Sequence, residues 1–158
     1  MKGTGGYMAA RIGELLIKSG FITEKQVDEA VEIQKGGKKK LGEILIELGY
    51  IVSRDLIRLL SEQAAIPFVE LRKEILDDKL IKSFPEKILY NNTIIPLYET
   101  EDQLYVAIGD PASRKVMNML LGFTNKEVVL SGAEPAKIIQ LLDKFFLIDQ
   151  TEGVLGDH

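Results

Sequence analysis

An internal repeat constrains the fold of this chain more than any other feature of its sequence. The first copy runs from Arg11 to Gln34 and the second from Lys40 to Gln63. Each copy has 24 residues, five residues separate the copies, and the offset between equivalent positions is 29 (40 minus 11). The identical positions are Gly13/Gly42, Glu14/Glu43, Leu16/Leu45, Ile17/Ile46, Gly20/Gly49, Ile22/Ile51 and Gln34/Gln63. We therefore expect one local structure to be built twice.

Each copy predicts two helices joined by a tight turn. In copy one, apolar residues recur at helical spacing from Ile12 to Leu16. Gly20 then stands where a left-handed C-terminal cap forms. Thr23 and Gln26 have the spacing of a capping box that begins a second helix. Copy two has the same order, so the repeat predicts a four-helix unit with breaks near Gly20, at residues 35–39 and near Gly49.

Two kinds of repeated residue are harder to explain as helix packing. Gly13 and Gly42 fall in the first helix of each copy, where glycine costs ~1 kcal/mol relative to alanine. Their matching positions suggest that something approaches the backbone closely, either the neighbouring helix or a ligand. Each copy also begins with a cation and ends with an amide, at Arg11 and Gln34 and at Lys40 and Gln63. Because such side chains are usually exposed, we interpret them as parts of a two-part site.

Composition excludes several classes of function. The 158 residues carry a net charge of −4, which argues against a general DNA- or RNA-binding protein. The chain has no cysteine, and its one histidine is His158, so disulfides, thiol chemistry, zinc sites and a Ser-His-Asp triad are not expected. No signal peptide and no apolar run of ~18 residues is recognisable. We expect a cytoplasmic protein without a metal or cofactor and without a membrane span.

The chain divides by pattern into four parts. Pro67 biases the residue before it away from the helical region, so we place a boundary there. The predicted parts are a flexible lead (1–8), a tandem helical repeat subdomain that binds a ligand (9–65), an α+β subdomain (66–147) and a tail or linker (148–158).

After residue 66 the pattern changes from helical to mixed. An extended piece at 68–71 precedes two short helices, at 75–83 and 85–90. Strands at 93–98, with Pro96 at an edge or bulge, and at 103–108 form a hairpin. We expect Asp110 to cap a helix that ends at Leu121, a third strand at 127–130, and a capping box at 131–134 that begins a last helix ending near Phe146. The predicted fold class is α+β, a four-helix repeat unit followed by a small α/β sandwich-like domain with a short sheet.

Motifs for catalysis are missing from the sequence. The chain has no Walker A frame and no Gly-x-Gly-x-x-Gly. We interpret the paired acids Asp77–Asp78 and Glu101–Asp102 as a solvated helix end and a solvated turn, so no general acid–base pair is expected. The basic spacer 35–40 has two interpretations. It is a solvated loop that complements the end of the preceding helix, or it concentrates an anionic ligand near the repeat.

The repeated pattern of a cation, an apolar residue, a glycine, a second glycine seven residues later, two spaced apolar residues and a closing glutamine resembles a known family. This family is the N-terminal, cyclic di-GMP-binding (MshEN) domain of type II secretion and type IV pilus assembly ATPases. The resemblance covers residues 11–63 at nearly every motif position, and residues from Pro67 to about 147 resemble the second half of the same N-terminal region. Ile12, Val27 and Val31 replace motif leucines, and Lys40 replaces an arginine.

The resemblance implies a ligand and a set of residues that hold it. Cyclic di-GMP is a two-fold-symmetric dianion with two guanines, so each copy could take one half. Arginine matches the O6/N7 edge of guanine, apolar side chains can cover its faces, and glycine lets backbone N–H groups approach a phosphate. The implied ligand-binding residues are Arg11, Ile12, Gly13, Val27, Val31 and Gln34 in copy one, and Lys40, Leu41, Gly42, Leu56, Leu60 and Gln63 in copy two.

Two functions follow from this resemblance, and neither is enzymatic. The first is a cyclic di-GMP-binding regulatory domain of a secretion or pilus ATPase, or a stand-alone receiver, because the ATPase domain of the family is absent from this sequence. The second is a protein-docking module that links the ATPase to the cytoplasmic part of an inner-membrane assembly protein without binding nucleotide. In the second case the repeat is only a scaffold, and Phe21 and Tyr50 are packing residues.

Overall fold

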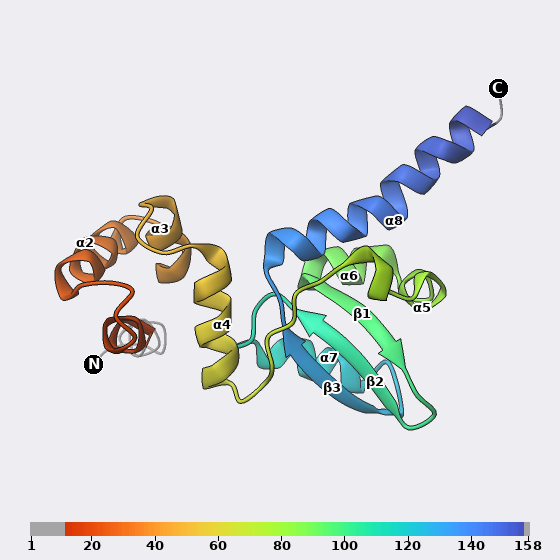
Figure 1. Cartoon of the computed structure of the whole chain (residues 1–158), viewed down its shortest axis with the longest axis horizontal. Coiled ribbons are helices and arrows are strands. Elements are labelled where there is room, and N and C mark those ends of the chain that lie inside the picture. The colour runs from red at the N-terminus through yellow and green to blue at the C-terminus, as the bar shows by residue number, and fades with distance from the viewer. Residues whose placement is uncertain (1–11, 157–158) are drawn as a thin grey trace. The chain divides into compact units, whose positions relative to one another are not determined.

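The computed structural model describes residues 12–156, with side chains described from 12 to 147. The predicted lead at 1–8 and the predicted site residue Arg11 lie outside the described residues. The chain forms two compact units, the first ending at Leu59 and the second beginning at Leu60. The division falls inside helix α4 (Ser53–Gln63), which Figure 1 shows in yellow.

The first unit is helical, as the repeat predicts. Copy one forms a helix over residues 12–18 and α2 (Glu24–Lys35), and copy two forms α3 (Leu41–Glu47) and α4. Among the described residues up to 63 there is no strand. The helices are interrupted near Gly20, at the spacer and near Gly49, which confirms all three predicted breaks.

The turns inside the two copies have the same backbone geometry. Gly20 has φ +80° and Gly49 has φ +79°, the left-handed conformation that glycine adopts without strain. The N–H of Tyr50 donates to the carbonyl of Leu45 at 3.0 Å, a bond typical of a glycine-capped helix end. Thr23 makes both bonds of its capping box, which confirms the predicted start of α2.

The repeated apolar residues form the interior of the first unit. Leu16 and Leu45, which occupy equivalent positions, are both fully buried. The remaining buried apolar residues of this unit are Ile22, Val27, Ala30, Leu41, Ile44, Ile51, Leu56 and Ile57. Burial of equivalent residues in both copies explains why the sequence repeats its apolar positions.

The second unit contains a three-stranded sheet and its covering helices. In chain order its elements are the 3-10 helix η1 (Lys73–Ile75), α5 (Asp78–Lys82), α6 (Glu86–Asn92), β1 (Ile94–Glu99), β2 (Gln103–Ile108), α7 (Arg114–Leu121), β3 (Glu127–Gly132) and α8 (Pro135–Gly156). The strand order is β1-β2-β3, with β1 antiparallel and β3 parallel to β2. This unit and the helical repeat together confirm the predicted α+β class.

Helices cover both faces of this sheet. Four consecutive residues of β1, 94–97, are buried, and consecutive strand residues point to opposite faces. Helices α5, α6 and α8 contact β1, and α7 contacts β3; Figure 1 shows α6 and α8 above β1 and α7 behind β2 and β3. The β1–β2 register shifts between Pro96 and Tyr98, which confirms the bulge expected at the proline.

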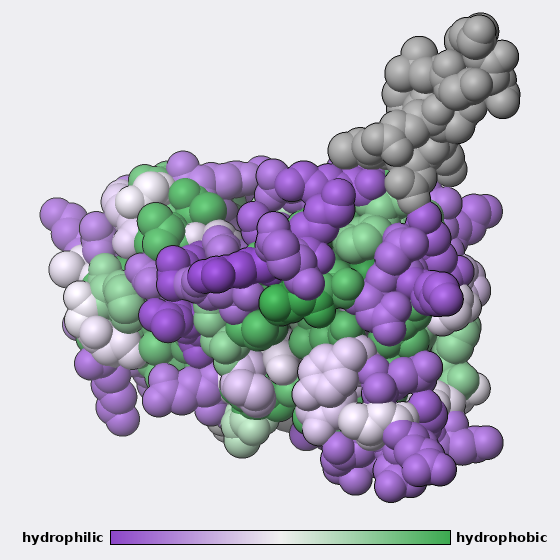
Figure 2. All heavy atoms as spheres, turned by 45° about the vertical axis from the view of Figure 1, so that its right-hand side comes forward, coloured by the Kyte–Doolittle hydropathy of each residue, from purple (hydrophilic) through white to green (hydrophobic). Residues whose placement is uncertain are grey.

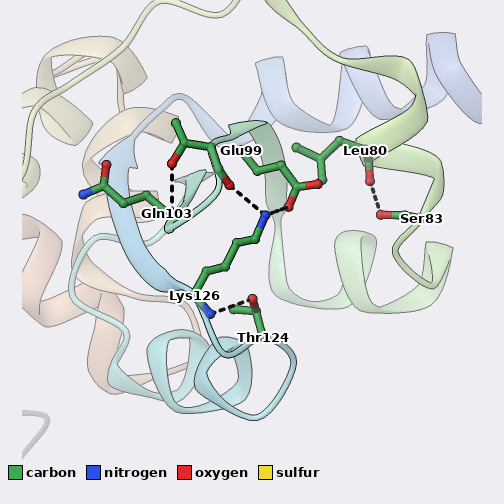
Figure 3. Close-up of polar contacts among 7 residues, drawn as sticks. Leu80, Ser83, Glu99, Gln103, Thr124 and Lys126 are labelled. Atoms are coloured by element: carbon green, nitrogen blue, oxygen red, sulfur yellow. Dashed lines mark hydrogen bonds and ion pairs between the residues drawn. The ribbon is translucent and has the colours of Figure 1, made fainter.

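A polar cluster fixes the far end of the hairpin to the start of β3. The Lys126 ammonium donates to the Glu99 carboxylate at 2.9 Å and to the Thr100 carbonyl at 2.7 Å (Figure 3). The Thr124 hydroxyl accepts the Lys126 N–H at 3.1 Å, and the Thr100 hydroxyl accepts the Gln103 N–H at 2.9 Å. These bonds give the hairpin end a structural role.

Two predicted helix starts are wrong. Asp110 does not cap α7, because its carbonyl accepts the N–H of Ser113 at 3.0 Å and closes a turn that keeps Pro111 buried. Ser113 is the N-cap, three residues later than predicted. The capping box at 131–134 is also wrong, because β3 continues to Gly132, where an extended segment pairs with it through Phe68.

The last helix is longer than the sequence suggested. It was expected to end near Phe146, but α8 continues to Gly156. The segment 147–156 contains no proline, and without such a breaker a helix can propagate despite the two glycines, Gly153 and Gly156.

Candidate functional site

The two repeated glycines make the same contact in both copies. A Cβ added at Gly13 would lie 3.0 Å from Val27 Cγ1, and one added at Gly42 would lie 2.7 Å from Leu56 Cδ2. Val27 and Leu56 are themselves equivalent residues, 29 positions apart (56 minus 27). The close approach predicted at these glycines is therefore made by the neighbouring helix of each copy. The four residues form a matched pair of contacts, which we call the glycine contacts.

The predicted ligand-binding residues differ in their access to solvent. Those that are buried supply the interior of the repeat: Gly13, Val27, Leu41, Gly42 and Leu56. Those that are half-buried are Ile12, Val31, Gln34 and Leu60, and those that are exposed are Lys40 and Gln63. Leu60 and Gln63 lie in the last turn of α4, which belongs to the second unit. The half-buried and exposed members are the ones available to a ligand in this conformation.

The spacer loop brings the end of copy one to the start of copy two. Gln34 Nε2 donates to the carbonyl of Lys39 at 3.4 Å. The N–H of Lys40 donates to Glu43 Oε2 at 3.4 Å, at the beginning of α3. The amide that closes copy one therefore lies beside the backbone that leads into the cation of copy two.

Carboxylates of the adjacent helices lie against the basic spacer. Lys35 forms an ion pair with Glu32 at 3.0 Å, and Lys39 pairs with Glu47. The hydrogen bond from Lys39 to Glu47, followed by the charge of Glu47, raises the pKa of Lys39. Because exposed ion pairs are worth little and exchange readily, these contacts favour the interpretation of a solvated loop for Lys35 and Lys39.

Three acids in the second unit have structural partners. Asp77 caps α5 by accepting the N–H of Leu80 at 3.2 Å, and Asp78 pairs with Lys82 at 3.4 Å. Tyr90 on α6 donates to Asp143 on α8 at 2.6 Å, and burial together with this bond raises the pKa of Tyr90. Among the described residues, no group of three His, Cys, Asp or Glu side chains is placed to hold a metal ion.

One polar contact of the repeat was not predicted from the sequence. The Tyr50 hydroxyl of copy two donates to the Glu29 carboxylate of copy one. The two residues are 21 positions apart, and no local pattern links a turn tyrosine to a glutamate at that distance. The change from Phe21 to Tyr50 at equivalent positions was the one available signal.

Some apolar side chains remain exposed. Figure 2 shows hydrophobic residues among hydrophilic ones over the visible face. In the first unit the exposed apolar residues include Phe21 and Val52, and in the second Leu121 and Phe123. Scattered exposed apolar residues are ordinary on protein surfaces, so they do not by themselves indicate a docking site. Within the described part of the chain, none of the helices combines the length and apolar character needed to cross a membrane.

Pilus ATPases are among the proteins that this chain resembles in sequence. It is 24% identical over 152 residues to the type IV pilus assembly ATPase PilB of Myxococcus xanthus, covering 95% of this chain and 27% of that protein. It is 27% identical over 149 residues to PilB of Pseudomonas aeruginosa, covering 89% of this chain and 25% of that protein. It is also 25% identical over 122 residues to the bacteriophage adsorption protein B of Escherichia coli K12, covering 75% of this chain and 16% of that protein. The chain thus spans about a quarter of the length of the pilus relatives.

Solved structures share the fold. The structure of MshE with cdg superposes with a TM-score of 0.76 at 24% identity, covering 85% of this chain and 98% of that one. The N-terminal domain of XpsE gives a TM-score of 0.67 at 18% identity, covering 90% and 96%. At these identities the likeness shows the arrangement of helices and strands.

The family model for the MshEN domain matches residues 64–152. This match covers the sheet and its helices, and it begins just after the closing glutamine of copy two. It covers more than half of the chain, and the solved structures that share the fold extend over both units. The chain therefore belongs to the MshEN domain family.

Proposed function

We propose that the protein is a cyclic di-GMP-binding regulatory domain of the kind found in type II secretion and type IV pilus assembly ATPases. The observation that carries this proposal is the pair of glycine contacts, which shows that the repeat is built twice in three dimensions. A ligand with two equivalent guanine nucleotide halves matches a protein with two equivalent half-sites. The structure of MshE with cdg, which shares this fold, supports the same ligand class.

The residues of each half-site have distinct proposed roles. Arg11 and Lys40 supply positive charge to the dianion, and the guanidinium of Arg11 can form two parallel bonds where Lys40 offers a single ammonium. Gln34 and Gln63 supply amide groups that can both donate and accept. The half-buried residues Ile12, Val31 and Leu60 cover guanine faces, while the glycine contacts hold the two helices of each copy together.

The proposed setting follows from the relatives. Because the chain belongs to the MshEN domain family and its sequence has no Walker A frame, we propose that the domain regulates and does not itself hydrolyse ATP. We place it in the cytoplasm, where its contact with the membrane would run through an inner-membrane assembly protein. Within residues 12–147, whose side chains are described, no observation favours a docking role alone.

Calorimetric titration of the purified chain with cyclic di-GMP tests the proposal. Arg11→Ala removes a charge-assisted contact worth roughly 1.5–3 kcal/mol, so we expect affinity to fall about tenfold to a hundredfold. Lys40→Ala should cost less, and Gln63→Ala should also weaken binding. Lys38→Ala, in the spacer and outside the proposed site, is the matched control, and added salt should weaken binding by the wild type.

Circular dichroism of each variant separates a lost contact from a lost fold. If the wild type gives no heat with cyclic di-GMP at high micromolar concentration, the proposed function is wrong. The docking module would then be the better description.

A further inference from the structure

The contact between Tyr50 and Glu29 joins the two copies of the repeat. The Tyr50 hydroxyl lies 2.5 Å from Glu29 Oε2 and 3.1 Å from Oε1, so it donates to the carboxylate between them. Tyr50 follows the left-handed Gly49 in the turn after α3, and its N–H bond to Leu45 holds the backbone of that turn. The tyrosine ring is therefore presented from a fixed turn.

Glu29 occupies a position in α2 that matters for the proposed half-site of copy one. It lies two residues from Val27, which makes the glycine contact, and two residues from Val31, a proposed guanine-covering residue. A bond to Glu29 therefore constrains the helix that carries copy one's half-site. Tyr50 itself is eight residues after Gly42, in the turn that closes the first helix of copy two.

The contact exists once, and the sequence explains why. The residue equivalent to Tyr50 in copy one is Phe21, which has no hydroxyl and is 44% exposed. The residue equivalent to Glu29 in copy two is Arg58, which cannot accept a hydrogen bond from a tyrosine. The Tyr50–Glu29 bond is thus a contact between the copies that the repeated sequence does not duplicate.

We propose that Tyr50, acting through Glu29, is a positioning residue that sets the distance between the two half-sites. This inference rests on the proposed function. A ligand with two guanine nucleotide halves gains affinity when its second half meets the second half-site at the right separation. If the protein already holds the half-sites at that separation, binding does not have to order them. Gln34 of copy one donates only to the spacer, to the Lys39 carbonyl at 3.4 Å in an exposed loop.

The test compares Tyr50→Phe with wild type in binding to cyclic di-GMP. The variant keeps the ring and loses only the hydroxyl, so we expect affinity to fall about threefold to tenfold with little change in the melting temperature. Phe21→Tyr is the matched control, because it adds a hydroxyl at the equivalent position, where the counterpart of Glu29 is Arg58, which cannot accept a hydrogen bond. That variant should bind as the wild type does.

A double-mutant cycle shows whether Tyr50 acts through Glu29. We expect Glu29→Gln to weaken binding less than Tyr50→Phe, and the double variant to bind no worse than Tyr50→Phe alone. Additive losses in the double variant would overturn the inference. Binding of GMP, which has one head, is followed by NMR at millimolar concentration and should be the same in wild type and Tyr50→Phe. An equal loss for GMP and cyclic di-GMP would place Tyr50 inside one half-site and overturn the positioning role.

The two proposals can fail separately. Wild-type binding with no loss in Tyr50→Phe overturns only the positioning role. A wild type that does not bind cyclic di-GMP overturns the proposed function, and with it this inference.

Discussion

The two copies of the repeat share their internal geometry but differ on their outer faces. Position 32 of copy one is Glu32, exposed on α2 and paired with Lys35. The equivalent position of copy two is Ser61, which is 1% exposed on α4. The repeat therefore sets the helices and turns of each copy. Whether the outer face of the second helix is exposed or buried depends on the structure that packs against it.

The neighbour of Ser61 is the end of β3. A Cβ added at Gly132 would lie 1.9 Å from Ser61 Oγ, so no side chain fits at that position. The N–H of Gly132 donates to the carbonyl of Pro67 at 2.7 Å, and the carbonyl of Gly132 accepts the N–H of Val69 at 2.8 Å. The end of α4 and the extended segment after it are thus fixed on the sheet of the second unit, whereas α2 ends in the exposed spacer.

Exchanging the residues at these equivalent positions should have the largest effect. Ser61→Glu would bury an unpaired carboxylate, so we expect it to destabilise the second unit by about 3–5 kcal/mol. Glu32→Ser changes an exposed residue and should stay within about 0.5 kcal/mol of wild type. Urea denaturation of both variants measures the difference. Equal losses would contradict the contrast between the two copies.

The glycine contacts should respond unequally to alanine. In each helix alanine gains ~1 kcal/mol over glycine, while overpacking costs about 1–3 kcal/mol. At Gly42 the new Cβ would lie 2.7 Å from Leu56 and a neighbour must move, so we expect Gly42→Ala to lose about 1–2 kcal/mol. At Gly13 the new Cβ would lie 3.0 Å from Val27, so its neighbour has to move less. The stability gained from alanine and the stability lost to overpacking should nearly cancel there.

A second substitution checks the cause of that inequality. Leu56→Val shortens the side chain that meets the new methyl group, so it should restore part of the stability lost in Gly42→Ala. If the double variant is instead less stable by the sum of the two single losses, steric overlap with Leu56 is not the reason.

The turn glycines should behave alike. Gly20 and Gly49 have nearly the same positive φ, and an added Cβ meets nothing within 4 Å at either position. Backbone conformation is then the only cost, so we expect Gly20→Ala and Gly49→Ala each to lose about 1 kcal/mol. Thermal denaturation followed by circular dichroism is sufficient to compare them. A large difference would show that the two turns are not equivalent.

The smallest expected effect is a dependence of stability on alkaline pH. We expect it from Tyr50 in copy two and not from the equivalent Phe21 in copy one. The hydrogen bond to Glu29, followed by burial and the charge of Glu29, raises the pKa of Tyr50 above its usual 10.0. Because the folded pKa is raised, the contribution of this bond is complete below the pKa of an unfolded tyrosine and is lost as pH rises through the folded value. The stability difference between wild type and Tyr50→Phe should therefore stay constant up to about pH 10 and shrink as the pH rises above it, through the raised pKa of the folded state. A difference that stays constant well above about pH 10 would show that ionisation of Tyr50 does not matter.

The sequence alone determined the parts of this protein that depend on near neighbours. The left-handed glycines, the capping box at Thr23 and the β1–β2 hairpin are signals within a few residues, and all three are confirmed. The repeated apolar residues predicted two helices in each copy, because helical periodicity is visible without knowing what packs on it. For the candidate site, the sequence supplied the list of residues and their symmetry.

Only the tertiary structure decided which residues meet across long separations. It separated the buried members of the candidate site, such as Leu56, from exposed ones such as Lys40. It moved the start of α7 past Asp110 and extended β3 to Gly132, because an extended segment more than 60 residues earlier, at Phe68, pairs there. Contacts of this kind depend on where distant segments pack, and the local periodicity and capping signals of a single sequence carry no information about that.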